Sequence, residues 1–245
     1  MLNKNVLLKV SKESIQLDNK FNDKFFNKHI FKDISEINIK NKNIYIVIEG
    51  EEVHIKLLKI PKIAKWDLNY LIKNELIFLY GKKADNIFYT YTIWDEDKDI
   101  REVLVFCINS NKLNSIENII KNNKLKSVKL IQFTIINYLK SKLSHKDYIL
   151  IFKDEDKIYF LGISNEKLIS NRIIENNIED EFLIDIFNYT IAKMKTFKII
   201  ANNVYGINFS KKDVIKYIEH NSYNYIDLQN ISKNKIIEYF SIKGK

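Results

Sequence analysis

Apolar residues gather in short runs at the start of the chain, and these runs predict two pairs of β-strands. Glu49, Gly50 and Glu51 separate the second pair as a polar turn. Pro61 ends the fourth strand, because proline has no backbone N–H to donate to a sheet. The expected strands are residues 6–10, 15–17, 44–48 and 53–60.

The next segment predicts an amphipathic helix over residues 65–80. Gly81 follows it at the position of a C-terminal cap, where glycine adopts a positive φ most easily. The apolar residues of this helix recur at helical spacing and are Trp66, Leu68, Leu71, Ile72, Leu76 and Leu79. Beyond it we expect strands at 87–94 and 103–108, joined by an acidic turn at 95–99. A helix should begin after Asn109 or Ser110 and bury Leu113, Ile116, Ile119 and Ile120. A strand at 128–131 and a helix over 133–139 should follow.

The pattern starts afresh after about Ser144, again with strands followed by helices. Two rounds of strands and helices predict an α/β protein with two lobes. We expect lobe 1 at residues 1–145, with an inserted subdomain at about 53–130, and lobe 2 at residues 146–245. The elements expected in lobe 2 are strands at 148–152, 158–163 and 167–174, a helix over 179–195, a strand at 198–201 and two amphipathic stretches.

The composition favours a folded protein that does not bind nucleic acid. A chain of 245 residues with 46% hydrophobic content can bury a large core. The formal net charge of +9 would favour nucleic acid if the basic residues were clustered. Lysines and arginines are instead interspersed with acidic residues along the chain, and no run resembles the basic arm of a nucleic-acid-binding protein.

Cysteine usage and the N-terminal sequence predict a cytoplasmic protein. The single cysteine, Cys107, lies in an apolar run, so we expect it in a buried strand, in keeping with a reducing compartment. Lys9 and Lys12 interrupt the apolar N-terminal stretch, which is too short for a signal peptide. No segment approaches the roughly 18 apolar residues of a membrane span, so we expect contact with the membrane only through partners.

Few residues form a pattern typical of catalysis or metal binding. The four histidines are far apart in the sequence and belong to no metal-binding motif. Asp95, Asp97 and Asp99 imitate the first ligands of a calcium loop. Ile100, however, occupies the position of the loop's glycine, and Phe106 that of its bidentate glutamate. We therefore expect a solvated turn, and no phosphate-binding glycine loop or nucleophile elbow occurs elsewhere in the sequence.

Several short pieces between residues 55 and 139 occur in a distinctive order. A strand ending in Ile-Pro is followed by a helix with an internal glutamate, an aromatic strand, a Val-rich strand and further helices. The pieces are Leu58-Lys59-Ile60-Pro61, Asp67-Leu68, Asn74-Glu75, Tyr89-Thr90-Tyr91 and Val103-Leu104-Val105-Phe106. In order and spacing this third of the chain resembles the middle of the PilM family of type IV pilus assembly proteins and, more loosely, the GspL-type cytoplasmic domains of type II secretion.

The resemblance implies an actin-like (ribonuclease-H-like) two-lobed α/β fold with an inserted small α/β subdomain, in which two hairpins bind phosphate through Asp-x-Gly turns. In the first hairpin, Lys9 stands for the family's aspartate, Ser11 for its glycine and Gln16 for its lysine. In the second, Phe152 stands for aspartate and Asp154 for glycine. The missing aspartates would leave magnesium without acidic ligands, and the Asp154 carboxylate would repel phosphate by roughly 1 to 4 kcal/mol at contact.

A third departure concerns the adenosine side of the implied nucleotide site. The family has Gly-Gly just after a strand that corresponds to residues 198–201. This sequence offers Asn202 and Asn203 there, with Gly206 nearby. We therefore carry over the fold and the scaffold role, and expect no cofactor, no metal and no ATP hydrolysis.

The function implied by the resemblance is a non-catalytic cytoplasmic scaffold that docks the cytosolic tail of a PilN-like bitopic inner-membrane protein and links it to the pilus assembly ATPase. Two alternatives stay open. One is the cytoplasmic domain of a GspL-like protein whose membrane helix lies beyond the given chain. The other, less favoured, is a ribonuclease-H-like enzyme, which would need an acidic cluster on its strands.

Aromatic and arginine side chains dominate binding hot spots, so we expect the partner surface on the inserted subdomain. The expected contact residues are Tyr70, Tyr89, Tyr91, Trp94 and Arg101.

Overall fold

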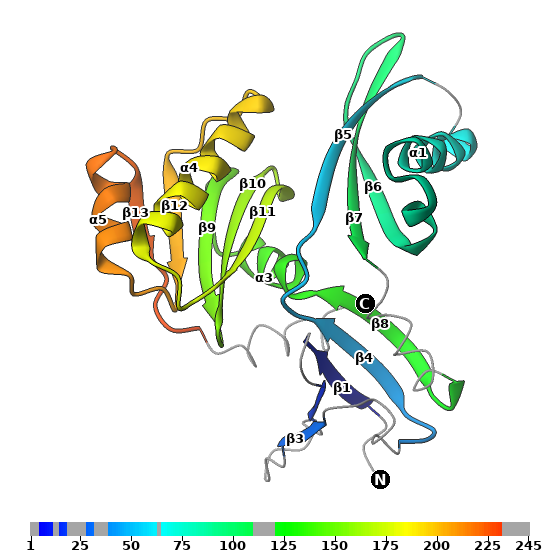
Figure 1. Ribbon diagram of the computed structural model, residues 1–245, viewed down its shortest axis with the longest axis horizontal. Coiled ribbons are helices and arrows are strands. Elements are labelled where there is room, and N and C mark those ends of the chain that lie inside the picture. The colour runs from blue at the N-terminus through cyan, green and yellow to red at the C-terminus, as the bar shows by residue number, and fades with distance from the viewer. Residues whose placement is uncertain are drawn as a thin grey trace. The chain divides into compact units, whose positions relative to one another are not determined.

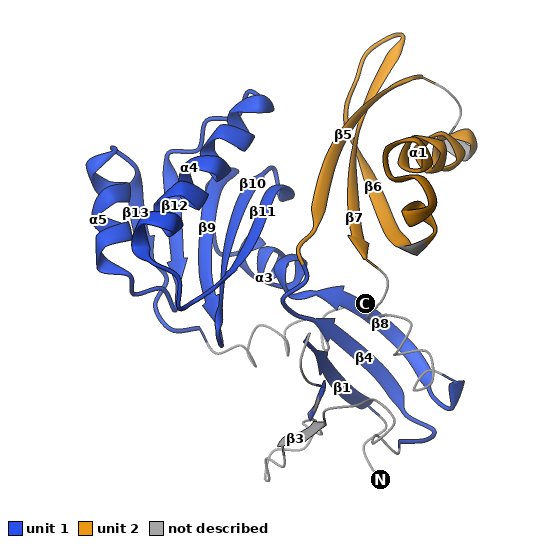
Figure 2. Cartoon of the chain, viewed as in Figure 1, with its two compact units in different colours: residues 1–51, 118–245 blue, residues 52–117 orange. Residues whose placement is uncertain are grey.

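The computed structural model describes residues 5–11, 15–18, 28–31, 39–62, 65–109 and 121–231, and within them the chain forms three β-sheets with accompanying helices (Figure 1). The chain divides into two compact units (Figure 2). Unit 1 combines residues 1–51 with 118–245, and unit 2 consists of residues 52–117. Unit 2 is therefore an insertion in the sequence of unit 1.

The first sheet of unit 1 contains β1 (Asn5–Val10), β2 (Ile15–Asp18), β3 (Lys28–Phe31), β4 (Asn43–Ile48) and β8 (Lys124–Leu130). Its strand order is β3-β2-β1-β4-β8. β1 pairs antiparallel with β2 and parallel with β4, and β8 lies parallel to β4 at the edge. Residues 6–10 of β1 are all buried, because a central strand has neighbours on both sides and is covered on both faces.

The second sheet of unit 1 repeats this arrangement. It contains β9 (Asp147–Asp154), β10 (Lys157–Ser164), β11 (Lys167–Glu175), β12 (Asn203–Ile207) and β13 (Asn224–Asp227), in the order β11-β10-β9-β12-β13. β9 pairs antiparallel with β10 and parallel with β12, as β1 does with β2 and β4. In both sheets the order by sequence is thus third, second, first, fourth, fifth, which indicates one α/β pattern used twice.

The helices of unit 1 are α3 (Ile131–Lys140), α4 (Asp180–Thr196) and α5 (Lys212–His220). α4 packs over β10 and β11 and lies beside α5 (Figure 1). Gly162 of β10 permits a close approach of α4, since a Cβ there would lie 2.8 Å from Met194 Cγ. Along the described part of the chain, no helix is both long and apolar enough to cross a membrane.

Unit 2 is a three-stranded antiparallel sheet with a helix packed against one face. It contains β5 (His54–Pro61), α1 (Lys65–Tyr80), the 3₁₀ helix η2 (Gly81–Asn86), β6 (Ile87–Glu96) and β7 (Ile100–Asn109), with the strand order β5-β7-β6. α1 confirms the helix predicted over residues 65–80. Gly81 follows it with a φ of +56°, which confirms the predicted end of the helix. The core combines one side of α1 with alternate residues of β5 and β7, namely Ile60, Leu68, Ile72, Leu76, Val103, Val105 and Cys107.

The prediction of a strand at residues 198–201 is wrong, because this stretch begins with the C-terminal cap of α4. The N–H of Lys198 bonds to Lys195 O and that of Ile199 to Met194 O, the two bonds of a Schellman cap. Lys198 has a φ of +59°, the left-handed conformation that this cap requires. The strand begins only at Asn203, as β12.

The inserted region is shorter than predicted at its C-terminal side. β8, which we expected inside the region 53–130, pairs with β4 in the first sheet, and unit 2 ends at Glu117. The sequence analysis also missed the edge strands β3 and β13. The helix expected to bury Leu113 and Ile116 lies outside the described residues.

Candidate functional site

The β1–β2 hairpin carries the first set of positions expected to replace nucleotide-binding groups. Lys9 pairs with Gln16 of β2 and with Val47 of β4, and its side chain is buried. Ser11 follows β1 directly and is half-buried. An ammonium group cannot coordinate a divalent cation, so the buried Lys9 side chain is no metal ligand.

The β9–β10 hairpin carries the second set. Phe152 is buried, and its ring stacks on Tyr159 with the ring centroids 4.2 Å apart. Asp154 pairs across the hairpin with Lys157, and Glu155 between them has a φ of +53°. Phe152 is thus held by aromatic packing, and the hairpin tip at residues 154–156 is acidic.

Contacts within unit 1 join β10 to the segment that follows β4. The Gly50 N–H donates a hydrogen bond to Tyr159 Oη at 2.8 Å, and the Glu49 N–H donates to Val10 O at 2.8 Å. A Cβ on Gly50 would lie 2.7 Å from Lys157 Nζ, so the lysine side chain lies against this turn. Burial raises the pKa of Tyr159 above its usual range, which keeps the phenol protonated. Residues 49 and 50 thus bond to the end of β1 through the backbone and contact β10 through the side chains of Tyr159 and Lys157.

A second set of polar contacts connects α3 with β11. Gln132 is fully buried, and its Nε2 donates hydrogen bonds to Glu51 O at 2.7 Å and to Asn171 Oδ1 at 3.3 Å. Buried amides of this kind hold their neighbours in one arrangement, since a broken bond leaves a polar group unsatisfied away from water.

The structure corrects the expected adenosine-side position. Asn202 and Asn203 lie before and at the start of β12, and do not follow a strand. Gly206 lies inside β12, where a Cβ would be 1.9 Å from Tyr225 Oη of β13. Gly206 therefore makes room for a tyrosine of the neighbouring strand.

Three of the expected partner-binding residues of unit 2 are tyrosines in different settings. Tyr89 and Tyr91 lie on the same side of β6 and pack against the core of the unit. Tyr89 Oη also donates a hydrogen bond to Asn69 Oδ1 at 2.9 Å. Tyr70 stands apart on α1 and is 67% exposed. Of the three, Tyr70 offers the most area to a partner.

Arg101, another expected contact residue, is 6% exposed. Its Nε donates a hydrogen bond to Glu96 Oε2 at 2.6 Å, and Lys62 Nζ lies 2.8 Å from the other oxygen of the same carboxylate. The charge of Arg101 is therefore paired within the turn of unit 2, which leaves little of this side chain for the partner contact expected from the sequence. Trp94, two residues before Glu96, is half-buried.

The sequence analysis missed the most exposed apolar side chain of α1, Phe78, which is 85% exposed. Tyr70 and Ile77 are also exposed and lie on one side of the helix, because seven residues make about two turns. Phe78 points about 100° away from Ile77 but is exposed as well, and we call the three exposed residues Tyr70, Ile77 and Phe78 the outer face of α1. The signal was the apolar run 77–79, since three consecutive helical residues point in directions about 100° apart and cannot all face one core.

No family model and no curated protein matches the chain in sequence. Its structure is nevertheless similar to solved structures over nearly their whole length. It superimposes on a chain of the PilM–PilN type IV pilus biogenesis complex with a TM-score of 0.61 at 8% identity, covering 100% of this chain and 94% of that one. A Bacteroides thetaiotaomicron protein of unknown function with an actin-like ATPase fold gives 0.55 at 12% identity, covering 96% and 95%. The chain has an actin-like fold.

A third similar structure is the cytoplasmic domain of EpsL, an inner-membrane component of the type II secretion system of Vibrio cholerae. Its TM-score is 0.59 at 6% identity, with 98% of this chain and 95% of that domain covered. The actin-like fold agrees with the repeated strand order of unit 1, in which the β1–β2 and β9–β10 hairpins hold equivalent positions. The fold expected from the sequence is thereby confirmed.

Proposed function

We propose that this protein is a non-catalytic scaffold of type IV pilus assembly. Its structural similarity to a chain of the PilM–PilN complex over the whole chain supports this role. The scaffold would dock the cytosolic tail of a PilN-like bitopic inner-membrane protein and link it to the pilus assembly ATPase. It would act in the cytoplasm and reach the inner face of the membrane through these partners.

The observation that carries the docking role is the outer face of α1. Tyr70, Ile77 and Phe78 expose apolar area on one helix, beside the exposed polar residues Lys73 and Asn74. Exposed apolar patches with polar rims are typical of protein interaction sites. We therefore add Ile77 and Phe78 to the proposed partner surface, which retains Tyr70, Tyr89, Tyr91 and Trp94.

The two hairpins of unit 1 support a role without ATP. Lys9 and the stacked Phe152 take the positions at which magnesium would need carboxylates. Asp154, at a position where the backbone would approach phosphate, adds a negative charge. We propose that the protein neither binds Mg-ATP specifically nor hydrolyses it.

A second candidate function is that of a GspL-like cytoplasmic domain of a type II secretion system. The similarity to the EpsL domain favours it. The two candidates differ in the sequence expected after Lys245, since a GspL-like protein continues into an apolar membrane span. Sequencing the native gene across this position separates them.

The scaffold proposal is tested by titrating the cytosolic N-terminal peptide of the bitopic pilus protein encoded beside this gene and following the melting temperature. A ligand in hundredfold excess over its Kd stabilises the folded state by about 2.7 kcal/mol, so the native protein should melt at a higher temperature. Phe78→Ser should abolish the shift, and Lys98→Ser, an exposed change in the β6–β7 turn outside the proposed surface, should retain it. No shift with the native protein refutes the docking role, and a shift that survives Phe78→Ser moves the site off the outer face of α1.

A further inference from the structure

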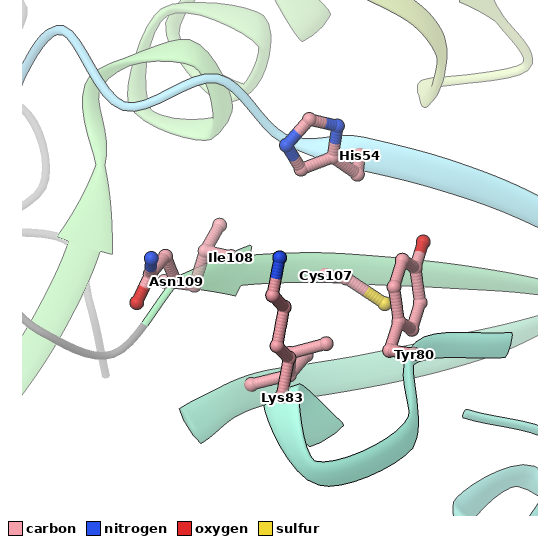
Figure 3. Close-up of a pocket in the computed structure, with 7 residues that line it drawn as sticks. His54, Tyr80, Lys83, Cys107, Ile108 and Asn109 are labelled. Carbon is pink, nitrogen blue, oxygen red and sulfur yellow. The ribbon is translucent and has the colours of Figure 1, made fainter. Parts of the chain in front are cut away.

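Unit 2 contains a cavity of about 450 Å³ between η2 and the ends of β5 and β7 (Figure 3). Cavities of this volume lie within the usual range for small-molecule sites. All lining residues belong to unit 2, so the cavity is complete within one compact part of the chain. They are His54, Tyr80, Lys83, Ile87, Cys107, Ile108 and Asn109.

One wall of the cavity is apolar and uncharged. Ile87 and Ile108 contribute aliphatic side chains, and both are half-buried. Cys107 is buried, and burial raises the pKa of its thiol to about 11, so the sulfur is neutral at physiological pH. This wall suits an apolar molecular body.

The polar groups of the cavity include one ammonium, from Lys83, and side chains of His54, Tyr80 and Asn109 that can donate hydrogen bonds. The Lys83 side chain extends from η2 and points its ammonium toward the space beneath the His54 ring, with the Asn109 amide to one side (Figure 3). No acidic residue is among the described residues that line the cavity. Within the described part of the chain, neither the Lys83 nor the His54 side chain forms a hydrogen bond or an ion pair.

We propose that this cavity binds a small carboxylate with a compact apolar body. The carboxylate would lie between the Lys83 ammonium and the His54 ring, and the apolar body against Ile87 and Ile108. An ammonium beside a weakly hydrated wall binds a carboxylate through a charge-assisted hydrogen bond, which is stronger than a neutral one. A cation of the same shape would be repelled, and a neutral amide would lose the charged part of the interaction.

This ligand site goes beyond the scaffold role and does not depend on it. The cavity and the proposed docking surface share no residue, because none of Tyr70, Ile77, Phe78, Tyr89, Tyr91 and Trp94 lines the cavity. A failed peptide titration therefore leaves the cavity proposal standing, and a cavity that binds no carboxylate leaves the docking proposal standing.

The experiment titrates full-length protein, labelled at isoleucine methyl groups, with hexanoate, hexanamide and hexylamine. Hexanoate should shift the methyl signals of Ile87 and Ile108, which are assigned by Ile→Val substitution. Its Kd should be at least about tenfold lower than that of hexanamide, because a hydrogen bond to a charged group contributes more than a neutral one. Hexylamine should bind more weakly than either.

Lys83→Met tests whether the preference for the anion comes from this ammonium. The variant should bind hexanoate and hexanamide with equal affinity. Lys82→Met removes the neighbouring exposed charge, which is not among the lining residues, and should keep the tenfold preference. Equal binding of acid and amide by the native protein, no methyl shift with hexanoate at millimolar concentrations, or an unchanged preference in Lys83→Met would each overturn the proposal.

Discussion

Individual acidic residues fix the turn between β6 and β7. Asp97 Oδ1 accepts hydrogen bonds from the N–H groups of Asp99 at 2.8 Å and Ile100 at 2.7 Å. These bonds lower the pKa of the Asp97 carboxyl. The pKa of Glu96 is lowered too, first by its hydrogen bond with Lys62 and next by that with Arg101. The turn that the sequence analysis compared with a calcium loop is thus closed by its own backbone and by two cations.

The Glu96 pairing predicts a specific dependence of stability on pH. Its folded pKa lies below the unfolded value of about 4.3, so the pairing stabilises the fold above that pH and is lost as the pH falls through the folded pKa. We expect Glu96→Gln to melt at a lower temperature than the native protein at about pH 7, and the difference to shrink as the pH falls below the unfolded pKa and through the lower folded pKa. Glu75→Gln, an exposed change on α1, is the control. A difference that persists unchanged at low pH would contradict this assignment.

The Tyr159 hydroxyl gives a second residue-level prediction. Tyr159→Phe keeps the ring that stacks on Phe152 but removes the acceptor of the Gly50 N–H. We expect the free energy of unfolding, measured in urea, to fall by about 1 kcal/mol. Tyr70→Phe removes an exposed hydroxyl and should stay within about 0.5 kcal/mol of the native protein. Equal stability of both variants would show that the link between β10 and the β4 end contributes nothing.

At the scale of elements, α1 has apolar residues on two opposite sides. Its inner side, with Leu68, Ile72 and Leu76, packs on the sheet of unit 2. Its outer face remains exposed among the described residues. A helix that is apolar on both sides has spare apolar area after its own core is complete, which is why we assign that area to a partner.

The two sides of α1 should respond differently to truncation. Leu76→Ala leaves a cavity in the core of unit 2 and should lower the free energy of unfolding by about 2–5 kcal/mol. Phe78→Ala removes an exposed ring and should change it by no more than about 0.5 kcal/mol. Chemical denaturation of both variants provides the measurement. A large loss with Phe78→Ala would mean that the outer face is covered within the protein.

Most elements were predictable from the sequence because their signals are local. The hairpins of both sheets and α1 follow from alternation and helical spacing within a few residues. β8 could not be assigned to the first sheet, since its pairing with β4 is decided by contacts some eighty residues apart. The stretch 198–201 carries apolar residues like a strand, but its position after α4 makes it a helix cap.

The residue types of the candidate site could be predicted from the sequence, but which of those side chains are exposed could not. Phe152 at an aspartate position could be read from the sequence, whereas its stacking on Tyr159 and the bond to Gly50 depend on long-range packing. Arg101 looks like a contact arginine until its register opposite Glu96 is known. Exposure depends on which neighbours cover a residue, and one sequence does not state those neighbours.

At the scale of the whole molecule, unit 1 uses one strand order twice, and unit 2 is inserted after the fourth strand of the first round. We propose that the two sheets are the cores of two lobes divided near residue 145. Each sheet carries a hairpin at the equivalent position. Under our proposal both hairpins lack the carboxylates of a nucleotide site, and the fold serves docking, which depends on surface and rigidity and not on phosphate transfer.

The most direct test of this account is a calorimetric titration of the partner's cytosolic tail into the full chain, carried out with and without Mg-ATP. The account predicts saturable binding with the same Kd in both conditions, because docking uses unit 2 and neither hairpin of unit 1 holds magnesium and phosphate. An absence of binding, or an affinity for the tail that changes when micromolar Mg-ATP is added, would contradict it.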